Sequence, residues 1–146
     1  MKNNDKVKKK PQVEAIRTEL NLPETLVFPS NAGNRETVLL IRGTGMGEGD
    51  REFGGRLLQG YLRALQEMVD VRGTVILYNE GVMMLQADHP ARTTLLSLPR
   101  PGLEVMVCQR SLKHYGLEIA PNEEINATTL LDIACRIDEA DKVITL

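Results

Sequence analysis

The stretch that decides the fold reads Thr37-Val-Leu-Leu-Ile41-Arg-Gly43-Thr-Gly45-Met-Gly47-Glu-Gly49-Asp50. Its first five residues form a continuous aliphatic and β-branched run, which is typical of a strand buried on both faces. Four glycines follow, and Asp50 is a good N-cap for a helix. The order of strand, glycine loop and helix predicts one unit of an α/β domain.

Apolar side chains at three- and four-residue spacing predict an amphipathic helix of roughly five turns after Asp50. They are Phe53, Leu57, Leu58, Tyr61, Leu65, Met68 and Val69. A second buried strand is predicted over residues 74–78, followed by a turn at Asn79-Glu-Gly81. The strand-helix alternation therefore repeats.

Further elements are expected downstream. They are helical pieces over 82–86 and 91–98, a third strand over 103–107, a short fourth strand over 117–120, a helix capped by Asn126 and ending near 139, and a last strand over 142–146. Strands that alternate with helices require crossover connections, which are right-handed and give parallel pairing. The sequence predicts an α/β fold, a three-layer α/β/α sandwich with a mostly parallel sheet of about five strands, over residues 37–146.

Residues 1–36 are predicted to be a basic tail and linker, with a possible short helix over 13–20. Residues 1–10 carry five lysines against one aspartate, whereas the whole chain has a net charge of −2. A terminal lysine run is typical of a solubilising arm, with contact to an anionic surface as the alternative. The remaining chain is acidic, has 3% aromatic residues and lacks Trp, so we expect no nucleic-acid partner.

No stretch approaches the roughly 20 apolar residues of a membrane span, and no secretory signal core is present. We therefore expect a cytoplasmic protein with no membrane contact, in which Cys108 and Cys135 are reduced. These cysteines and the two histidines, His89 and His114, lack the close paired spacing of zinc sites. No metal and no cofactor are predicted, and Cys135 is expected to pack on its helix.

The glycine loop, Gly43 to Gly49, matches neither nucleotide-binding motif. Glu48 and Asp50 stand where the dinucleotide fingerprint needs glycine or alanine, and the Gly-Lys-Ser/Thr of a P-loop is absent. A tight turn is the favoured interpretation, and a ligand role stays open.

Cys108 follows the third predicted strand directly and enters a polar, partly cationic turn with Arg110, Lys113 and His114. Nearby cations and helix N–H groups favour a thiolate. Asn79 and the glycine loop are expected at the same sheet edge, because ligands collect at the carboxyl ends of parallel strands. A reactive thiol and a merely packed one are both compatible with this pattern.

Several segments carry a family resemblance. They are residues 41–62, 76–82, 105–108, 114–117 and 139–144. In order and spacing they resemble the DsrE-like sulfurtransferase family, most closely the C-terminal domain of YedF-type proteins associated with selenium metabolism. The resemblance implies a sulfur or selenium carrier that receives sulfane sulfur on Cys108 from a donor protein and passes it to an acceptor protein. It also implies a homo-oligomer.

We predict supporting roles around Cys108 for Asn79, Arg110, Ser111, Lys113 and His114, with Arg110, Lys113 and His114 tuning the thiolate. Two departures limit it: YedF-type proteins tend to have a second cysteine where Ser111 stands, and an N-terminal TusA-like domain that the residues before 37 are too few to form. The alternative function is a noncatalytic DsrE-like subunit or binding module acting in a homo-oligomer.

Overall fold

The computed structural model describes residues 35–146 together with Thr18, Glu19 and Asn21. The chain divides into two units, residues 1–30 and residues 31–146. In the first, Thr18 and Glu19 are helical and exposed. The rest of the helix expected over 13–20, like most of the predicted tail and linker, lies outside the described residues.

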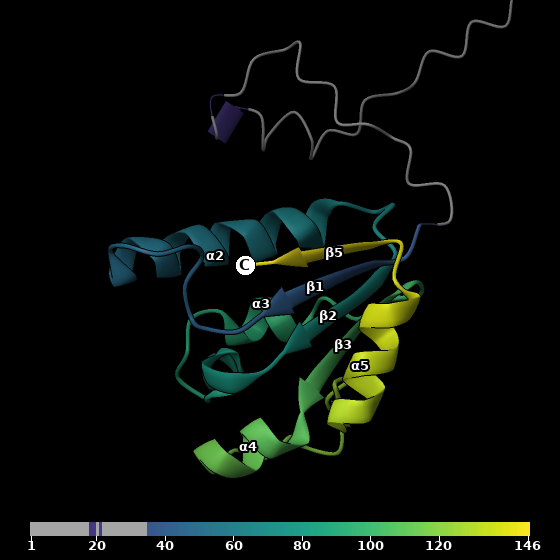
Figure 1. The fold of residues 1–146 in the computed structure, drawn as a ribbon. Helices are drawn as coiled ribbons and strands as arrows, with labels where there is room; N and C mark the ends of the chain where they lie inside the picture. Colours follow the sequence, from purple (N-terminus) through teal and green to yellow (C-terminus); the bar gives the residue numbers. More distant parts are fainter. Residues whose placement is uncertain (1–17, 20, 22–34) are drawn as a thin grey trace, which may run out of the picture. The chain divides into compact units, whose positions relative to one another are not determined.

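The second unit contains a five-stranded sheet, drawn in Figure 1. Its strands are β1 (Thr37–Ile41), β2 (Gly73–Leu77), β3 (Leu103–Cys108), β4 (Asn126–Thr128) and β5 (Lys142–Thr145). The spatial order is β4-β3-β2-β1-β5, and every neighbouring pair is parallel. The predicted α/β class and strand number are confirmed, and the sheet is parallel throughout.

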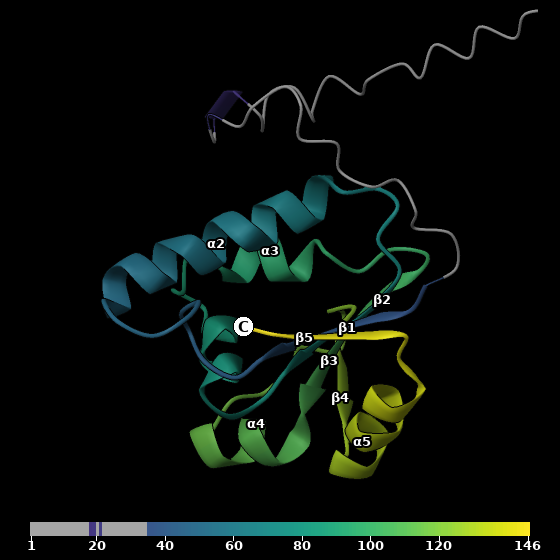
Figure 2. The same cartoon turned by 45° about the horizontal axis from the view of Figure 1, so that its top comes forward.

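Helices cover both faces of this sheet. They are α2 (Arg51–Glu67), the 3-10 helix η1 (Asn79–Leu85), α3 (Arg92–Leu96), α4 (Gln109–Tyr115) and α5 (Leu130–Glu139). The chain steps in one direction from β1 to β4 and then returns across the sheet to β5. Because right-handed crossovers in opposite directions leave helices on opposite faces, α2 and α3 lie on one face and α5 on the other (Figure 2).

The glycine loop folds back onto the start of α2. The Met46 backbone N–H donates to the Gly54 carbonyl oxygen at 2.9 Å, and the Phe53 N–H donates to Asp50 Oδ1 at 2.7 Å. Gly47 and Gly49 have φ angles of 76° and 118°, where a side chain would be strained. These contacts account for the loop as a tight turn, and the predicted Asp50 cap is confirmed.

The two faces of the sheet are packed unequally. On the α2 face, the odd-numbered strand side chains join a cluster that includes Leu58, Leu62, Val82 and Leu95, all fully buried. On the α5 face, five buried residues form a separate cluster: Val38, Ile76, Met106, Cys108 and Ile133. Most of the buried apolar surface thus lies between the sheet and α2, η1 and α3.

The structure corrects the expected fourth strand and the start of the last helix. Residues 117–120 form no strand, because the Leu117 N–H instead bonds to the Leu112 carbonyl at the end of α4. The fourth strand is β4, which contains Asn126, and the N-cap of α5 is Thr129. Thr129 and Asp132 form a capping box, the stronger signal in this segment.

Four of the seven apolar residues predicted to line α2 are exposed. The buried residues of α2 are Gly54, Leu58, Leu62 and Leu65. Phe53, Leu57, Met68 and Val69 are exposed by 43% to 54%. A second apolar row on α2 is therefore open to solvent.

The prediction that Cys135 packs on its helix is wrong, because Cys135 is exposed. Helix α5 turns Ile133 and the partly buried Ile137 toward the sheet. Cys135 and Leu131 then face outward, and Leu131 is 73% exposed.

Candidate functional site

Cys108 is the last residue of β3 and the N-cap of α4, as its position after an apolar run predicts. Its side chain is 3% exposed and packs with Val38, Ile76, Met106 and Ile133. The thiol makes no capping hydrogen bond to α4. The sequence left open whether this thiol is reactive or merely packed. In the structure the thiol is packed, and it also lies at the junction of β3 and the polar helix α4.

A pocket of about 270 Å³ opens at this end of the sheet. Its lining residues are Tyr78, Asn79, Cys108, Arg110, Ser111, His114, Tyr115 and Leu130. The structure brings together five of the six site residues predicted from the sequence. The sixth, Lys113, is exposed on α4 and does not line the pocket.

Strand register explains why these residues meet. Ile41 is in register with Leu77, and Leu77 with Val107. The next residues, Tyr78 just after β2 and Cys108 at the end of β3, therefore lie at the same end of the sheet. This is the end at which parallel sheets hold ligands and reactive groups.

Asn79 ties the end of β2 to α4. Its backbone N–H donates to Ser111 Oγ at 2.8 Å, and the Tyr115 hydroxyl donates to Asn79 Oδ1 at 3.3 Å. Asn79 itself has φ of 50°, a conformation that asparagine tolerates better than most residues. Asn79, Ser111 and Tyr115 thus form one wall of the pocket and hold α4 beside η1.

Gly81 sets the position of that wall. A Cβ atom at residue 81 would lie 2.3 Å from the Ile41 carbonyl oxygen, which is too close for any side chain. The Tyr78 N–H donates to the same oxygen at 3.1 Å. The turn after β2 is therefore pressed against the end of β1, and only glycine fits there.

Two basic side chains stand on the pocket wall, both from α4. Arg110 and His114 are exposed, and the His114 ring contacts the Tyr115 ring edge-on at 4.9 Å between centroids. The pocket offers a thiol, a permanent cation, an imidazole and a hydroxyl to a small ligand.

The sequence analysis missed Tyr78, Tyr115 and Leu130 as pocket residues. Tyr78 directly follows β2 and was predictable from the same edge argument as Cys108. Leu130 begins α5 and is 50% exposed. No local pattern connects Leu130 to Cys108, because only the return of the chain along the α5 face brings them together.

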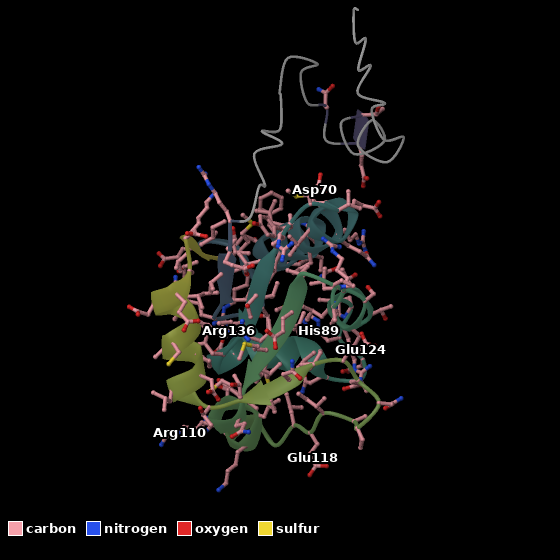
Figure 3. The ribbon with its side chains drawn as sticks, turned by 90° about the vertical axis from the view of Figure 1, so that its right-hand side faces the viewer. Asp70, His89, Arg110, Glu118, Glu124 and Arg136 are labelled. Carbon is pink, nitrogen blue, oxygen red and sulfur yellow. The ribbon has the colours of Figure 1, made fainter. Side chains whose placement is uncertain are left out.

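A larger hollow, of about 620 Å³, lies at the opposite, amino-terminal ends of the strands. Arg136 contacts Glu104 there at 2.9 Å, and the Asn126 amide donates to Glu104 at 2.8 Å. Figure 3 shows Arg136 on α5, well separated from Arg110 near α4. We place the candidate site at the smaller pocket, because it brings together five of the six site residues predicted from the sequence.

In the described part of the chain, no group of three or more His, Cys, Asp or Glu side chains is placed to hold a metal ion. The glycine loop does not line the thiol pocket. None of the helices described is both long enough and apolar enough to cross a membrane.

No protein-family model matches the chain, and no curated protein matches it either. Solved structures do. The YchN protein of Escherichia coli is 17% identical with a TM-score of 0.55, over 76% of this chain and 99% of that one. MTH1491 of Methanobacterium thermoautotrophicum, a protein of unknown function, is 22% identical with a TM-score of 0.55, over 77% and 100%.

BT1422 of Bacteroides thetaiotaomicron, a conserved protein of unknown function, is 14% identical with a TM-score of 0.56, over 76% of this chain and 95% of that one. Likeness at this level of identity establishes the fold alone, and the link to YedF-type proteins stays a prediction. The chain has the DsrE/YchN-like α/β fold.

Proposed function

We propose that this protein carries sulfane sulfur, or by extension selenium, as a persulfide on Cys108. One observation carries the proposal: the Cys108 thiol lies on the wall of a pocket that also holds Arg110 and His114. The fold likeness and the position of the cysteine after the third strand support it.

The reaction needs two displacement steps. The Cys108 thiolate attacks the outer sulfur of a donor persulfide, a new S–S bond forms, and the donor leaves as a thiolate. An acceptor thiolate then attacks the outer sulfur of the Cys108 persulfide and releases the Cys108 thiolate. No electrons are gained or lost overall, and each step needs an ionised attacking thiol.

Burial of the thiol restricts the donor. At 3% exposure, Cys108 is reached through a pocket of about 270 Å³, which admits a small persulfide or an extended cysteine-bearing tip. Arg110, which lines the pocket, attracts the anionic persulfide and balances the charge of the product. Small inorganic polysulfide is accordingly the probe of choice.

The experiment uses the Cys135→Ser variant, because exposed Cys135 would otherwise react with polysulfide. We expect intact-mass analysis to show one added sulfur atom, released by a low-molecular-weight thiol. The Cys135→Ser/Cys108→Ser double variant should stay unmodified. An adduct that survives in the double variant, or no adduct in Cys135→Ser, contradicts the proposal.

The role of the basic side chains is tested by the alkylation rate of Cys108 at neutral pH. We expect Arg110→Gln and His114→Gln to slow the reaction by several-fold each, because the thiolate loses a nearby cation or donor. Lys113→Gln is the matched control, since Lys113 lies on the same helix outside the pocket. Equal slowing by all three would indicate only a general effect of charge.

The burial of Cys108 favours a second candidate, a noncatalytic subunit or binding module within a homo-oligomer. In that case the thiol is a packing residue on the α5 face beside Met106 and Ile133. Alkylation of Cys108 would then be slow in the folded protein, and Cys108→Ala would leave partner binding unchanged. The alkylation rate therefore separates the two functions.

A further inference from the structure

Ser111 has a hydroxyl hydrogen that the fold does not use. The Ser111 Oγ atom accepts a hydrogen bond from the Asn79 backbone N–H at 2.8 Å. Among residues 35–146, which the structure describes, no group accepts a hydrogen bond from this hydroxyl. A serine hydroxyl has one hydrogen to donate besides its two lone pairs, and Ser111 lines the thiol pocket. The hydrogen is therefore available to a molecule bound in the pocket.

Ser111 also lies next to Cys108 on the surface of α4. Cys108 is the N-cap of this helix, and Ser111 is its third residue. These are the two positions that exchange hydrogen bonds in a capping box, so their side chains are neighbours. At Cys108 no side-chain cap bond forms, and both residues line the pocket. A group added to the Cys108 thiol from the pocket is accordingly beside the Ser111 hydroxyl.

The backbone sets the position of the Ser111 oxygen. The N–H that donates to it belongs to the turn after β2, where Asn79 has φ of 50° and Gly81 is pressed against the Ile41 carbonyl oxygen. Because this donor is a main-chain group in a tightly packed turn, it holds the hydroxyl in place before a ligand arrives. Donors held in this way stabilise charge with little reorganisation.

The other hydroxyl of α4 is already engaged. Tyr115 also lines the pocket, but its hydroxyl donates to Asn79 Oδ1 at 3.3 Å. Arg110 is exposed and lines the pocket, so it attracts anions over a distance. Of the two hydroxyl groups on α4, Ser111 is the one that can make a short, directional contact with a ligand.

We propose that the Ser111 hydroxyl donates a hydrogen bond to the charged outer sulfur of the Cys108 persulfide and thereby favours transfer of sulfur to this cysteine. This role rests on the proposed function. It assigns to Ser111 the selection of an anionic sulfur over a neutral group, because hydrogen bonds to charged acceptors are the stronger ones.

The step with inorganic polysulfide balances as follows. The Cys108 thiolate attacks the terminal S–H sulfur of the polysulfide and forms a new S–S bond. The old S–S bond breaks, and the shortened polysulfide leaves as an anion with the bonding electron pair. The outer sulfur of the persulfide then releases its proton to water and carries the negative charge. The Ser111 hydrogen stays on its oxygen and only bonds to this sulfur.

Two reagents separate this role from a structural one. Ser111→Ala is made in the Cys135→Ser background, in which Cys108 is the remaining cysteine. With polysulfide, intact-mass analysis should show a persulfide that forms about tenfold more slowly than in the Cys135→Ser protein, as expected for loss of a hydrogen bond to a charged group. With iodoacetamide, which leaves no charged sulfur on Cys108, the rate should change by less than about twofold.

Threonine and valine at position 111 isolate the hydroxyl, because their side chains have nearly the same shape. Ser111→Thr should retain most of the polysulfide rate, whereas Ser111→Val should be as slow as Ser111→Ala. Ser97→Ala is the matched control: Ser97 also accepts a hydrogen bond, from the Gln66 amide, and does not line the pocket. Its substitution should change neither rate. Circular dichroism confirms that each variant is folded.

The proposal fails on any of three results. The first is a Ser111→Ala variant that forms the persulfide as fast as the Cys135→Ser protein. The second is an equal fall in the polysulfide and iodoacetamide rates, which would mean that Ser111 only holds the pocket wall through Asn79. The third is a Ser111→Thr variant as slow as Ser111→Val. If the Cys135→Ser protein itself takes up no sulfur, the proposed function fails, and this role with it.

Discussion

Among the residues that the structure describes, the α2 face of the sheet is covered by α2, α3 and η1, whereas the α5 face is covered by α5. On the α2 face, Leu58, Leu62 and Leu95 are completely buried. On the α5 face, the buried cluster is much smaller and contains Cys108, which lines the pocket. We therefore expect the α2 face to supply most of the stability, and the α5 face to hold the thiol beside the pocket.

The largest expected effect is on the α2 face. Leu58→Ala should lower the free energy of unfolding by about 3 to 5 kcal/mol, because it removes a fully buried side chain from a well-enclosed site and leaves a cavity. Urea unfolding measures it. Leu131→Ala is the control and should change stability by less than about 0.5 kcal/mol. If Leu58→Ala lowered the free energy of unfolding by less than Ile133→Ala, its counterpart on the α5 face, the α5 face would be the more important one for stability.

Ile133→Ala tests the α5 face with a side chain of similar size. We expect a loss of about 2 kcal/mol, at the low end for such substitutions, because one helix covers this face and the site can relax. The same urea experiment measures the loss. If Ile133→Ala matched Leu58→Ala, the two faces would contribute equally despite their different cover.

Thr129→Ala removes the cap that anchors α5. The Asp132 N–H donates to Thr129 Oγ1 at 3.2 Å, and the Thr129 hydroxyl donates to Asp132 Oδ2 at 2.7 Å. We expect a loss of about 1 kcal/mol and faster hydrogen exchange in α5 than in α2. Hydrogen exchange that rises equally in both helices would show that the two faces unfold as one unit.

The smallest effect is a dependence on acid. Hydrogen bonds from the Thr129 hydroxyl, and then from that of Thr128, hold the pKa of Asp132 below its ordinary value. A depressed carboxyl pKa adds stability above the unfolded-state pKa, and this stability is lost as pH falls through the folded-state pKa. The stability difference between the natural sequence and Asp132→Asn should therefore shrink on acidification.

Urea midpoints of the natural sequence and Asp132→Asn, taken from neutral to acidic pH, measure this dependence. Thr129→Ala should show a weaker acid dependence than the natural sequence, because the main hydrogen bond to the carboxylate is gone. If the stability difference between the natural sequence and Asp132→Asn did not change with pH, the contribution of Asp132 to stability would not depend on its charge.

Much of the fold was predictable because its signals are local. The aliphatic run before the glycine loop marks β1, and the residues from Asp50 onward mark α2 to within two residues. The capping box at Thr129 is equally local, but Asn126 offers a competing signal, because asparagine is also common at helix N-caps. Three-residue β4 has too little pattern to be recognised without its neighbour β3.

The site was predictable in part, because some of its residues also lie close together in the sequence. Cys108, Arg110, Ser111 and His114 follow one strand, so their proximity is a property of one segment. Asn79 could be placed at the same edge because parallel strands end together. Lys113 is exposed on α4 and does not line the pocket, whereas Leu130 lines it from a helix that is distant in sequence.

The sequence by itself determined the α/β class, the parallel sheet and a cysteine at the carboxyl end of the third strand, because apolar periodicity and strand order specify these over a few residues. Only the tertiary structure decided how deeply Cys108 is buried, that Cys135 is exposed, and which apolar row of α2 faces the core. Those properties depend on which helices cover each face of the sheet. The connection from β4 back to β5 decides this, because it places α5 on the face opposite α2 and α3.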